Sequence, residues 1–255
     1  MRPIWVLAVN TFKEVIRDRI LYALIVFAIL LIGFSLALGQ LSFAEQARIS
    51  TDFGLGAIHL CAVVLAVFIG SNLVYKEIEK KTILTILVRP ISRVQFILGK
   101  SLGLTLLILT MTAGLAAILA LIFAGIGVKL DERLLIVLLG IMSEALVLLG
   151  FTILFSMFTK PLLVVVFSIG IFLIGHWQDS LRFFANQADG GPLKPVAWAV
   201  QYGLPDLERL NWKSLIVYDM PLDLPAKMSS FAYALVWFAL CISLSALVFK
   251  RKDVG

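Results

Sequence analysis

Apolar runs long enough to cross a membrane recur along this chain, and they restrict its fold more than any other feature. A helix of about 20 apolar residues spans a hydrocarbon core of about 30 Å. Such runs lie at about residues 20–38, 57–75, 102–128, 134–158, 162–177 and 231–249. Hydrophobic residues make up 61% of the chain and charged residues 15%, which excludes an ordinary soluble domain. The sequence therefore predicts an all-α membrane protein with six transmembrane helices.

Little of the chain remains outside these runs. Six spans and their connections use nearly all 255 residues, so we expect one membrane domain over residues 1–255 and no separate soluble enzyme domain. Cys61 and Cys241 both lie inside apolar runs, which is typical of buried packing residues rather than of a disulfide framework. The net charge of +6 comes from basic residues beside the apolar runs. It therefore indicates membrane orientation rather than nucleic-acid binding.

The N-terminal segment, residues 1–19, predicts a helix that lies in the membrane interface. Trp5, Val9, Phe12 and Ile16 recur at spacings of three to four among charged residues, which is an amphipathic pattern. A cleaved signal peptide is the alternative, but its apolar stretch would be shorter and nearer the N-terminus. Lys and Arg gather in alternate connections, so the positive-inside rule places both termini in the cytoplasm. We expect a multi-pass protein of the cell inner (plasma) membrane.

A long connection, residues 179–230, separates the fifth and sixth spans and is expected to lie outside the cell. Its pieces at 181–185 and 195–202 are too short to span, and they predict short helices at the outer interface. Trp198, Tyr202 and Trp212 suit that depth. This loop could gate a pathway or bind a periplasmic partner.

The cytoplasmic connection, residues 76–99, is basic and amphipathic. Residues 77–87 can form a short helix, and Pro90 ends it because proline disfavours helix in the residue before it. Ser92 can then cap the helix that leads through Gly99 and Lys100 into the third span. A charged helix at this surface could be pushed by a soluble partner; an ordinary solvated loop is the alternative.

This connection resembles the cytoplasmic motif of the ABC type-2 exporter permeases. The matching residues are Glu77, Glu79, Lys80, Thr82, Leu87, Pro90, Ile91, Ser92, Arg93, Gly99 and Lys100. The chain departs from the motif at Lys81, where the family usually has Gly, and this puts the local turn geometry in question. The resemblance extends over the interfacial helix, the six spans and the external loop. Residues 204–213 are similar to the subgroup of copper-processing permeases associated with nitrous oxide reductase.

The resemblance implies that the connection contains a coupling helix that contacts a separate ABC ATPase subunit. The ATPase-coupling residues would be Glu77, Glu79, Lys80, Thr82, Leu84, Leu87, Pro90, Ser92 and Arg93. Arg93 could instead be a simple interfacial anchor. Two ATPase copies would bind ATP and Mg, so we expect no cofactor in this chain. The resemblance also implies a second permease chain, which gives a homodimer in the simplest case, and export as the direction of transport.

The run Gly99-Lys100-Ser101 is not a phosphate-binding loop. Such a loop needs another Gly five residues before the Gly-Lys-Ser, so that backbone amides can surround a phosphate, and this chain has Val94 there. We therefore expect no ATP hydrolysis by the chain itself. Gly99 and Gly103 instead predict a close-packing pair at the start of a helix.

Glu144 is the one acid well inside a predicted span. A charge at that depth costs about 2.5–3.5 kcal/mol on insertion scales, so Glu144 is a candidate functional residue. A protonated Glu144 that faces Ser, Thr or Asn72 in the bundle is the alternative. His59 and His176 fall near the outer ends of their predicted helices and could approach each other. Because two histidines make a poor metal site without further ligands, no metal is expected.

Two other functions are conceivable for a membrane protein of this kind, an intramembrane protease and a self-contained carrier or channel. An intramembrane protease needs a base beside an activated serine or a His-Glu-x-x-His pair, and neither pattern occurs near His176. We therefore expect a transport subunit and not an enzyme. A self-contained ion-coupled carrier or channel is the alternative to the exporter permease.

Overall fold

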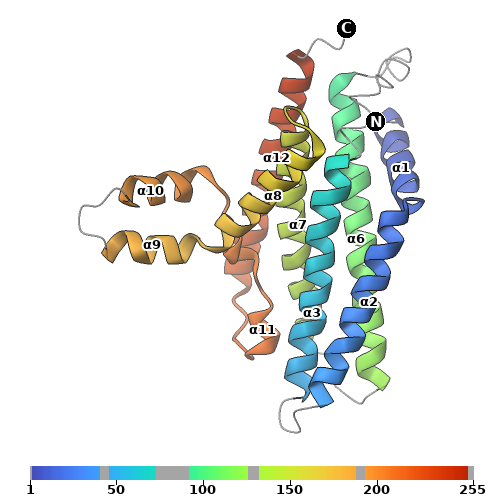
Figure 1. The fold of residues 1–255 in the computed structure, drawn as a ribbon, viewed down its shortest axis with the longest axis vertical. Coiled ribbons are helices and arrows are strands. Elements are labelled where there is room, and N and C mark those ends of the chain that lie inside the picture. The colour runs from blue at the N-terminus through green and yellow to red at the C-terminus, as the bar shows by residue number, and fades with distance from the viewer. Residues whose placement is uncertain (1, 41–45, 73–91, 126–131, 188–192, 252–255) are drawn as a thin grey trace.

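Residues 2–40, 46–72, 92–125, 132–187 and 193–251 are described by a computed structural model of the chain. In these ranges the chain is helical and contains no strand (Figure 1). The elements are α1 (Arg2–Ile16), α2 (Arg19–Gln40), α3 (Gln46–Val64) with a π-helical continuation η1 (Leu65–Ile69), α6 (Arg93–Gly125), α7 (Leu134–Ser156), α8 (Pro161–His176), α9 (Gln178–Gln187), α10 (Leu193–Gly203), η2 (Glu208–Leu210), α11 (Ser214–Val217) and α12 (Leu224–Arg251).

Five helical segments within these ranges are long and apolar enough to cross a membrane. They are Arg19–Gln40, Gln46–Asn72, Arg93–Gly125, Leu134–Ser156 and Leu224–Arg251. A sixth span exists if α8 is joined to Gln178–Phe184, from which it is bent by 58°. The predicted all-α membrane fold is confirmed.

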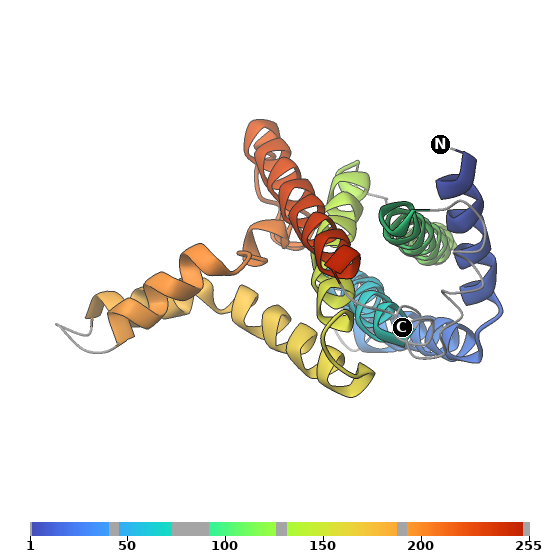
Figure 2. The same cartoon turned by 90° about the horizontal axis from the view of Figure 1, so that it is seen from above.

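The predicted fifth span differs from the other five. Its helix, α8, has 16 residues and is therefore about 24 Å long, which is short of a 30 Å hydrocarbon core. The chain then bends at Trp177 into α9, and α9 and α10 project sideways from the bundle (Figures 1 and 2). The helix predicted over 162–177 is present as α8, and it crosses a membrane only if it is joined to the bent segment that follows. The two short helices predicted in the external loop are confirmed as α9 and α10.

The described ends of the chain, α1 and the end of α12, lie at the same end of the bundle in Figure 1. The start of α6 and the end of α3 lie at that end too, so the connection between Asn72 and Ser92 begins and ends there. Most of the predicted coupling segment, including Glu77, Glu79, Lys80, Thr82, Leu84, Leu87 and Pro90, lies outside the described residues.

Two spans begin earlier than hydropathy predicts. The second begins at Gln46 rather than near residue 57, because polar residues at its start pack against α2. Ser50 is fully buried there, and its hydroxyl donates to the carbonyl of Ser35 over 3.4 Å. The last span begins at Leu224 rather than near residue 231.

Helix α1 packs obliquely against the first turns of α6 (Figures 1 and 2). A Cβ atom at Gly99 would lie 2.5 Å from Cβ of Leu7, and one at Gly103 would lie 2.6 Å from the carbonyl oxygen of Ala8. The predicted close-packing role of Gly99 and Gly103 is confirmed. The buried face of α1 carries Ala8, Thr11 and Val15, whereas Trp5 is 60% exposed, so the small residues of the helix face the protein.

Replacing Gly103 with alanine should lower the thermal unfolding midpoint of the detergent-solubilised chain. The added methyl would overlap α1 backbone, and such overpacking costs about 1–3 kcal/mol. Gly114 in the same helix is the matched control, because a Cβ there meets nothing within 4 Å. Gly114→Ala should be neutral or stabilising by about 0.5–1 kcal/mol, since alanine is the better helix former. Equal midpoints for the two variants would contradict the close contact between α1 and α6.

Candidate functional site: a buried histidine and carboxylate cluster

Three titratable side chains from three helices meet inside the bundle. Glu144 lies near the middle of α7 and is 1% exposed. His59 lies near the middle of the Gln46–Asn72 span and is 8% exposed, and His176 is the last residue of α8. The predicted approach of the two histidines is confirmed, since their ring centroids lie 6.2 Å apart. The expectation that His59 lies near the outer end of its helix is wrong, because that helix begins at Gln46.

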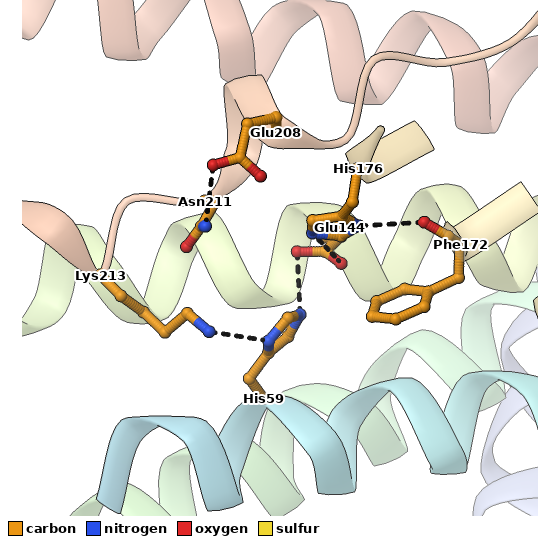
Figure 3. Close-up of polar contacts among 7 residues, drawn as sticks. All are labelled: His59, Glu144, Phe172, His176, Glu208, Asn211 and Lys213. Carbon is orange, nitrogen blue, oxygen red and sulfur yellow. Dashed lines mark hydrogen bonds and ion pairs between the residues drawn. The ribbon is translucent and has the colours of Figure 1, made fainter. Parts of the chain in front are cut away.

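Glu144 stands between the two histidines (Figure 3). Its Oε2 lies 2.9 Å from Nε2 of His59, and its Oε1 lies 3.5 Å from Nε2 of His176. Nδ1 of His176 lies 3.0 Å from the carbonyl oxygen of Phe172, one turn earlier in α8. A carbonyl only accepts hydrogen bonds, so Nδ1 of His176 carries the proton that it donates, and Nε2 of this ring faces the carboxylate.

Two buried atoms of this cluster lack a hydrogen bond. Among the described residues, neither Nε2 of His59 nor Oε1 of Glu144 has a hydrogen-bond partner, although both atoms are buried. The 2.9 Å contact between His59 and Glu144 is thus a close approach without hydrogen-bond alignment. Buried polar atoms without partners are costly and rare in native proteins, which marks this cluster as a candidate site.

A segment of the connection between α8 and α12 covers the cluster. This segment, residues 204–217, contains η2 and α11 and is called the cap below; it contacts α3, α7 and α12. Its buried apolar side chains include Leu207, Leu210, Trp212 and Leu215. Lys213 reaches from the cap into the cluster, where its Nζ lies 3.2 Å from Nδ1 of His59 (Figure 3).

Two glycines let the cap approach the helices closely. A Cβ at Gly140 of α7 would lie 2.8 Å from the carbonyl oxygen of Leu210, and one at Gly175 of α8 would lie 2.6 Å from Cγ of Leu207. The backbone N–H of Leu207 donates to the carbonyl of Gly175 over 3.1 Å. The cap is therefore packed against α7 and α8 next to Glu144 and His176.

The beginning of the cap is tied to α9 and α12 by polar contacts. The backbone N–H of Asp206 donates to the hydroxyl of Tyr233 over 2.8 Å, and its carboxylate lies 3.6 Å from Arg182. Burial, and then the nearby carboxylate of Asp179, raise the pKa of Asp206, while Arg182 opposes the shift. These contacts hold the cap at the junction with the bent fifth span.

The other predicted intramembrane residue, Asn72, does not join the cluster. It lies thirteen residues after His59 in one continuous helix, which corresponds to about 20 Å along the axis. Its side-chain amide donates to the carbonyl of Phe68 over 3.0 Å. Asn72 lines a small cavity with Glu14 and Asp18 at the end of the bundle where α1 lies.

Ser92 and Arg93, at the described end of the predicted coupling segment, are both hydrogen-bonded. The backbone N–H of Ser92 donates to Gln95 and that of Gln95 donates to the Ser92 hydroxyl, which confirms the predicted helix cap. Arg93 donates to the carbonyls of Phe249 and Lys250 at the end of α12, over 3.1 and 3.2 Å. The start of α6 is thereby fixed to the C-terminal helix.

Lys100, about two turns further along α6, is also fixed. It is 4% exposed, and its Nζ lies 3.4 Å from Oε2 of Glu14 in α1. The first turns of α6 therefore contact α1 as well as α12.

Sequence reasoning missed two residues of the site, both in the cap. Trp212 is predicted as an outer-interface residue, but it is 3% exposed and packs against Gly140, and its indole N–H donates to the carbonyl of Arg209 over 2.7 Å. Trp198 and Tyr202, by contrast, are exposed as predicted. Lys213 carries no sequence signal that separates it from other loop lysines.

Comparison with known protein families matches nearly the whole chain to one of them. The match covers residues 5–254, and the family is described as ABC-2 family transporter protein. A search of curated proteins found no match. The fold agrees with this family assignment, since the described residues form an all-helical bundle with spans long enough to cross a membrane. The chain therefore belongs to the ABC-2 family of transporter proteins and is a membrane permease.

Proposed function

We propose that this permease exports a substrate from the cytoplasm with energy from ATP that separate ABC ATPase subunits hydrolyse. The contact with the ATPase is the segment at residues 76–99, and ATP and Mg bind to the partner and not to this chain. The family match and the exporter-type motif from Glu77 to Lys100 support this proposal.

The main structural support for this proposal is the attachment of the start of α6 to α1 and α12. The first turns of α6 are held on one side by the pair of Lys100 with Glu14, and on the other by the contacts of Arg93 with the end of α12. A force applied to the segment before Ser92 would therefore move α1, α6 and α12 together. A coupling element requires such contacts, because they transmit a movement of the ATPase to the membrane-spanning helices.

The assembly that we propose contains two permease chains, in the simplest case a homodimer, and two ATPase subunits in the cell inner membrane. Both termini face the cytoplasm, and the external loop is free to contact a periplasmic partner. Residues 204–213, which are similar to the copper-processing subgroup, lie within the cap. A copper substrate is tested by comparing periplasmic copper in cells with and without the chain; equal amounts would exclude it.

Single cysteines at Lys194 and Lys250 should label from opposite sides of the membrane. Both side chains are exposed, and they lie in α10 and at the end of α12. The background carries alanine at Cys61 and Cys241, which are both buried. An impermeant maleimide added to intact cells should modify position 194 alone, and position 250 should react only after the cells are opened. Labelling of position 250 in sealed cells would reverse the orientation.

The function itself is tested by purifying the unmodified chain from its native membrane. An ABC ATPase should co-purify, and transport in vesicles should stop when ATP is withheld. Transport that continues without ATP and follows an ion gradient would favour the self-contained carrier instead.

A further inference from the structure

We propose that His59, Glu144 and His176 form a binding site for one divalent transition-metal ion of the Zn²⁺ type. Two imidazoles and one carboxylate make up a ligand set that proteins use for Zn²⁺ with a fourth position left open. Both histidines of the chain lie in this cluster. The expectation of no metal rested on two histidines alone, and the structure places a third candidate ligand between them.

The separations of the ligand atoms are close to those of a metal site. One ligand atom from each of the three residues lies within 4.8 Å of the other two. Zn–N and Zn–O bonds of about 2.0–2.2 Å in a tetrahedral site place neighbouring ligand atoms about 3.4 Å apart. The carboxylate of Glu144 already lies 2.9 and 3.5 Å from the two Nε2 atoms. Small side-chain movements would bring the three residues around one ion.

The unpartnered atoms are the second argument for an ion. Nε2 of His59 and Oε1 of Glu144 are buried, lack hydrogen bonds among the described residues, and lie on the sides of their groups that face the cluster. A buried carboxylate is costly unless it is paired or coordinates a metal. A bound cation would satisfy both atoms at once.

The chemistry of the ligands indicates the class of ion. Imidazole suits Zn²⁺, Cu²⁺, Ni²⁺ and Fe²⁺, whereas Cu⁺ prefers thiolate or thioether ligands. No cysteine belongs to the cluster, and carbonyl oxygens, which Ca²⁺ and Mg²⁺ favour, are absent from its three candidate ligands. The site therefore fits a borderline divalent metal.

Lys213 would compete with this ion. A lysine ammonium only donates hydrogen bonds, so its contact with Nδ1 of His59 requires the tautomer that carries its proton on Nε2. Metal coordination through Nε2 requires the opposite tautomer, with the proton on Nδ1. The contact of Lys213 and the coordinated ion are thus mutually exclusive, and binding of the ion would release Lys213, and with it this attachment of the cap.

The proposal is tested by calorimetric titration of Zn²⁺ into the full-length chain, purified without a polyhistidine tag. We expect one ion per chain, and X-ray absorption should show two imidazoles in its coordination shell. Glu144→Gln and His176→Gln should each weaken binding at least about tenfold, because each removes a ligand. Lys213→Gln should strengthen binding about tenfold, because it removes a competing cation.

Glu208→Gln is the matched control, since Glu208 lies beside the cluster but is bonded to Asn211 and is not a candidate ligand. Its affinity should equal that of the unmodified chain. Binding that no ligand substitution alters would be adventitious and would overturn the site. If Lys213→Gln binds Zn²⁺ as tightly as the unmodified chain or less tightly, Lys213 does not compete with the ion for His59. Because the measurement needs neither ATP nor an ATPase, its failure would leave the exporter proposal standing.

Discussion

A permease with glutamine in place of Glu144 should lose at least about nine-tenths of its transport while it still assembles. Glutamine has nearly the shape of a protonated glutamate, so packing in α7 is retained. It cannot carry the negative charge that faces His59 and His176 at 2.9 and 3.5 Å. A buried polar group left without a partner costs about 1–3 kcal/mol, and a loss of about 2 kcal/mol corresponds to roughly a thirtyfold effect.

The variant is expressed in a strain from which the chain has been deleted, and its ability to reverse the defect of that strain is measured. The amount of the variant in the membrane is measured in the same cells. Glu208→Gln controls for the loss of an acid that lies in the cap and does not belong to the cluster. If Glu144→Gln restores the phenotype fully, Glu144 is a neutral packing residue and has no role in transport.

Much of this fold follows from hydropathy because a bilayer imposes its own length on a span. The predicted span at 134–158 and the helix Leu134–Ser156 nearly coincide, and the predicted span at 20–38 lies inside Arg19–Gln40. The early start at Gln46 could not be predicted, since it depends on packing of Ser50 against α2. The break after His176 is likewise a tertiary effect, because an apolar run of 16 residues does not show where its helix bends.

The site was only partly predictable for a similar reason. A glutamate inside an apolar run stands out, so Glu144 was identifiable, and the two histidines of the chain were easy to single out. Their meeting with Glu144 depends on the lengths of α3 and α8. The cap depends on close contacts at Gly140 and Gly175, and neither glycine differs in sequence from those that face open space. Lys213 therefore became a site residue only in three dimensions.

Replacing Leu87 with aspartate should weaken binding of the ATPase about thirtyfold or uncouple ATP hydrolysis from transport. An apolar residue of a coupling helix would be buried in a groove of its partner, and loss of such a contact costs about 2 kcal/mol or more. The variant with Glu77→Lys and Glu79→Lys should also bind less well, because charged residues set the register of such contacts. Arg93 is left unchanged, since its contacts with the end of α12 would confound the result.

Glu132→Lys is the control for these charge changes. Glu132 is an exposed acid beside the start of α7, at the opposite end of the bundle from α1. If residues 76–99 bind the ATPase, this substitution should leave both binding and coupling unchanged.

The most direct test of the account is the amount of ABC ATPase that co-purifies with each of these chains, measured with ATP-driven transport in vesicles. The account predicts that the unmodified chain and Glu132→Lys retain the ATPase and transport, whereas Leu87→Asp loses one or both. If no ATPase co-purifies with the unmodified chain, or if Leu87→Asp behaves like Glu132→Lys, the segment does not couple an ATPase to the permease, and a self-contained carrier is the better description.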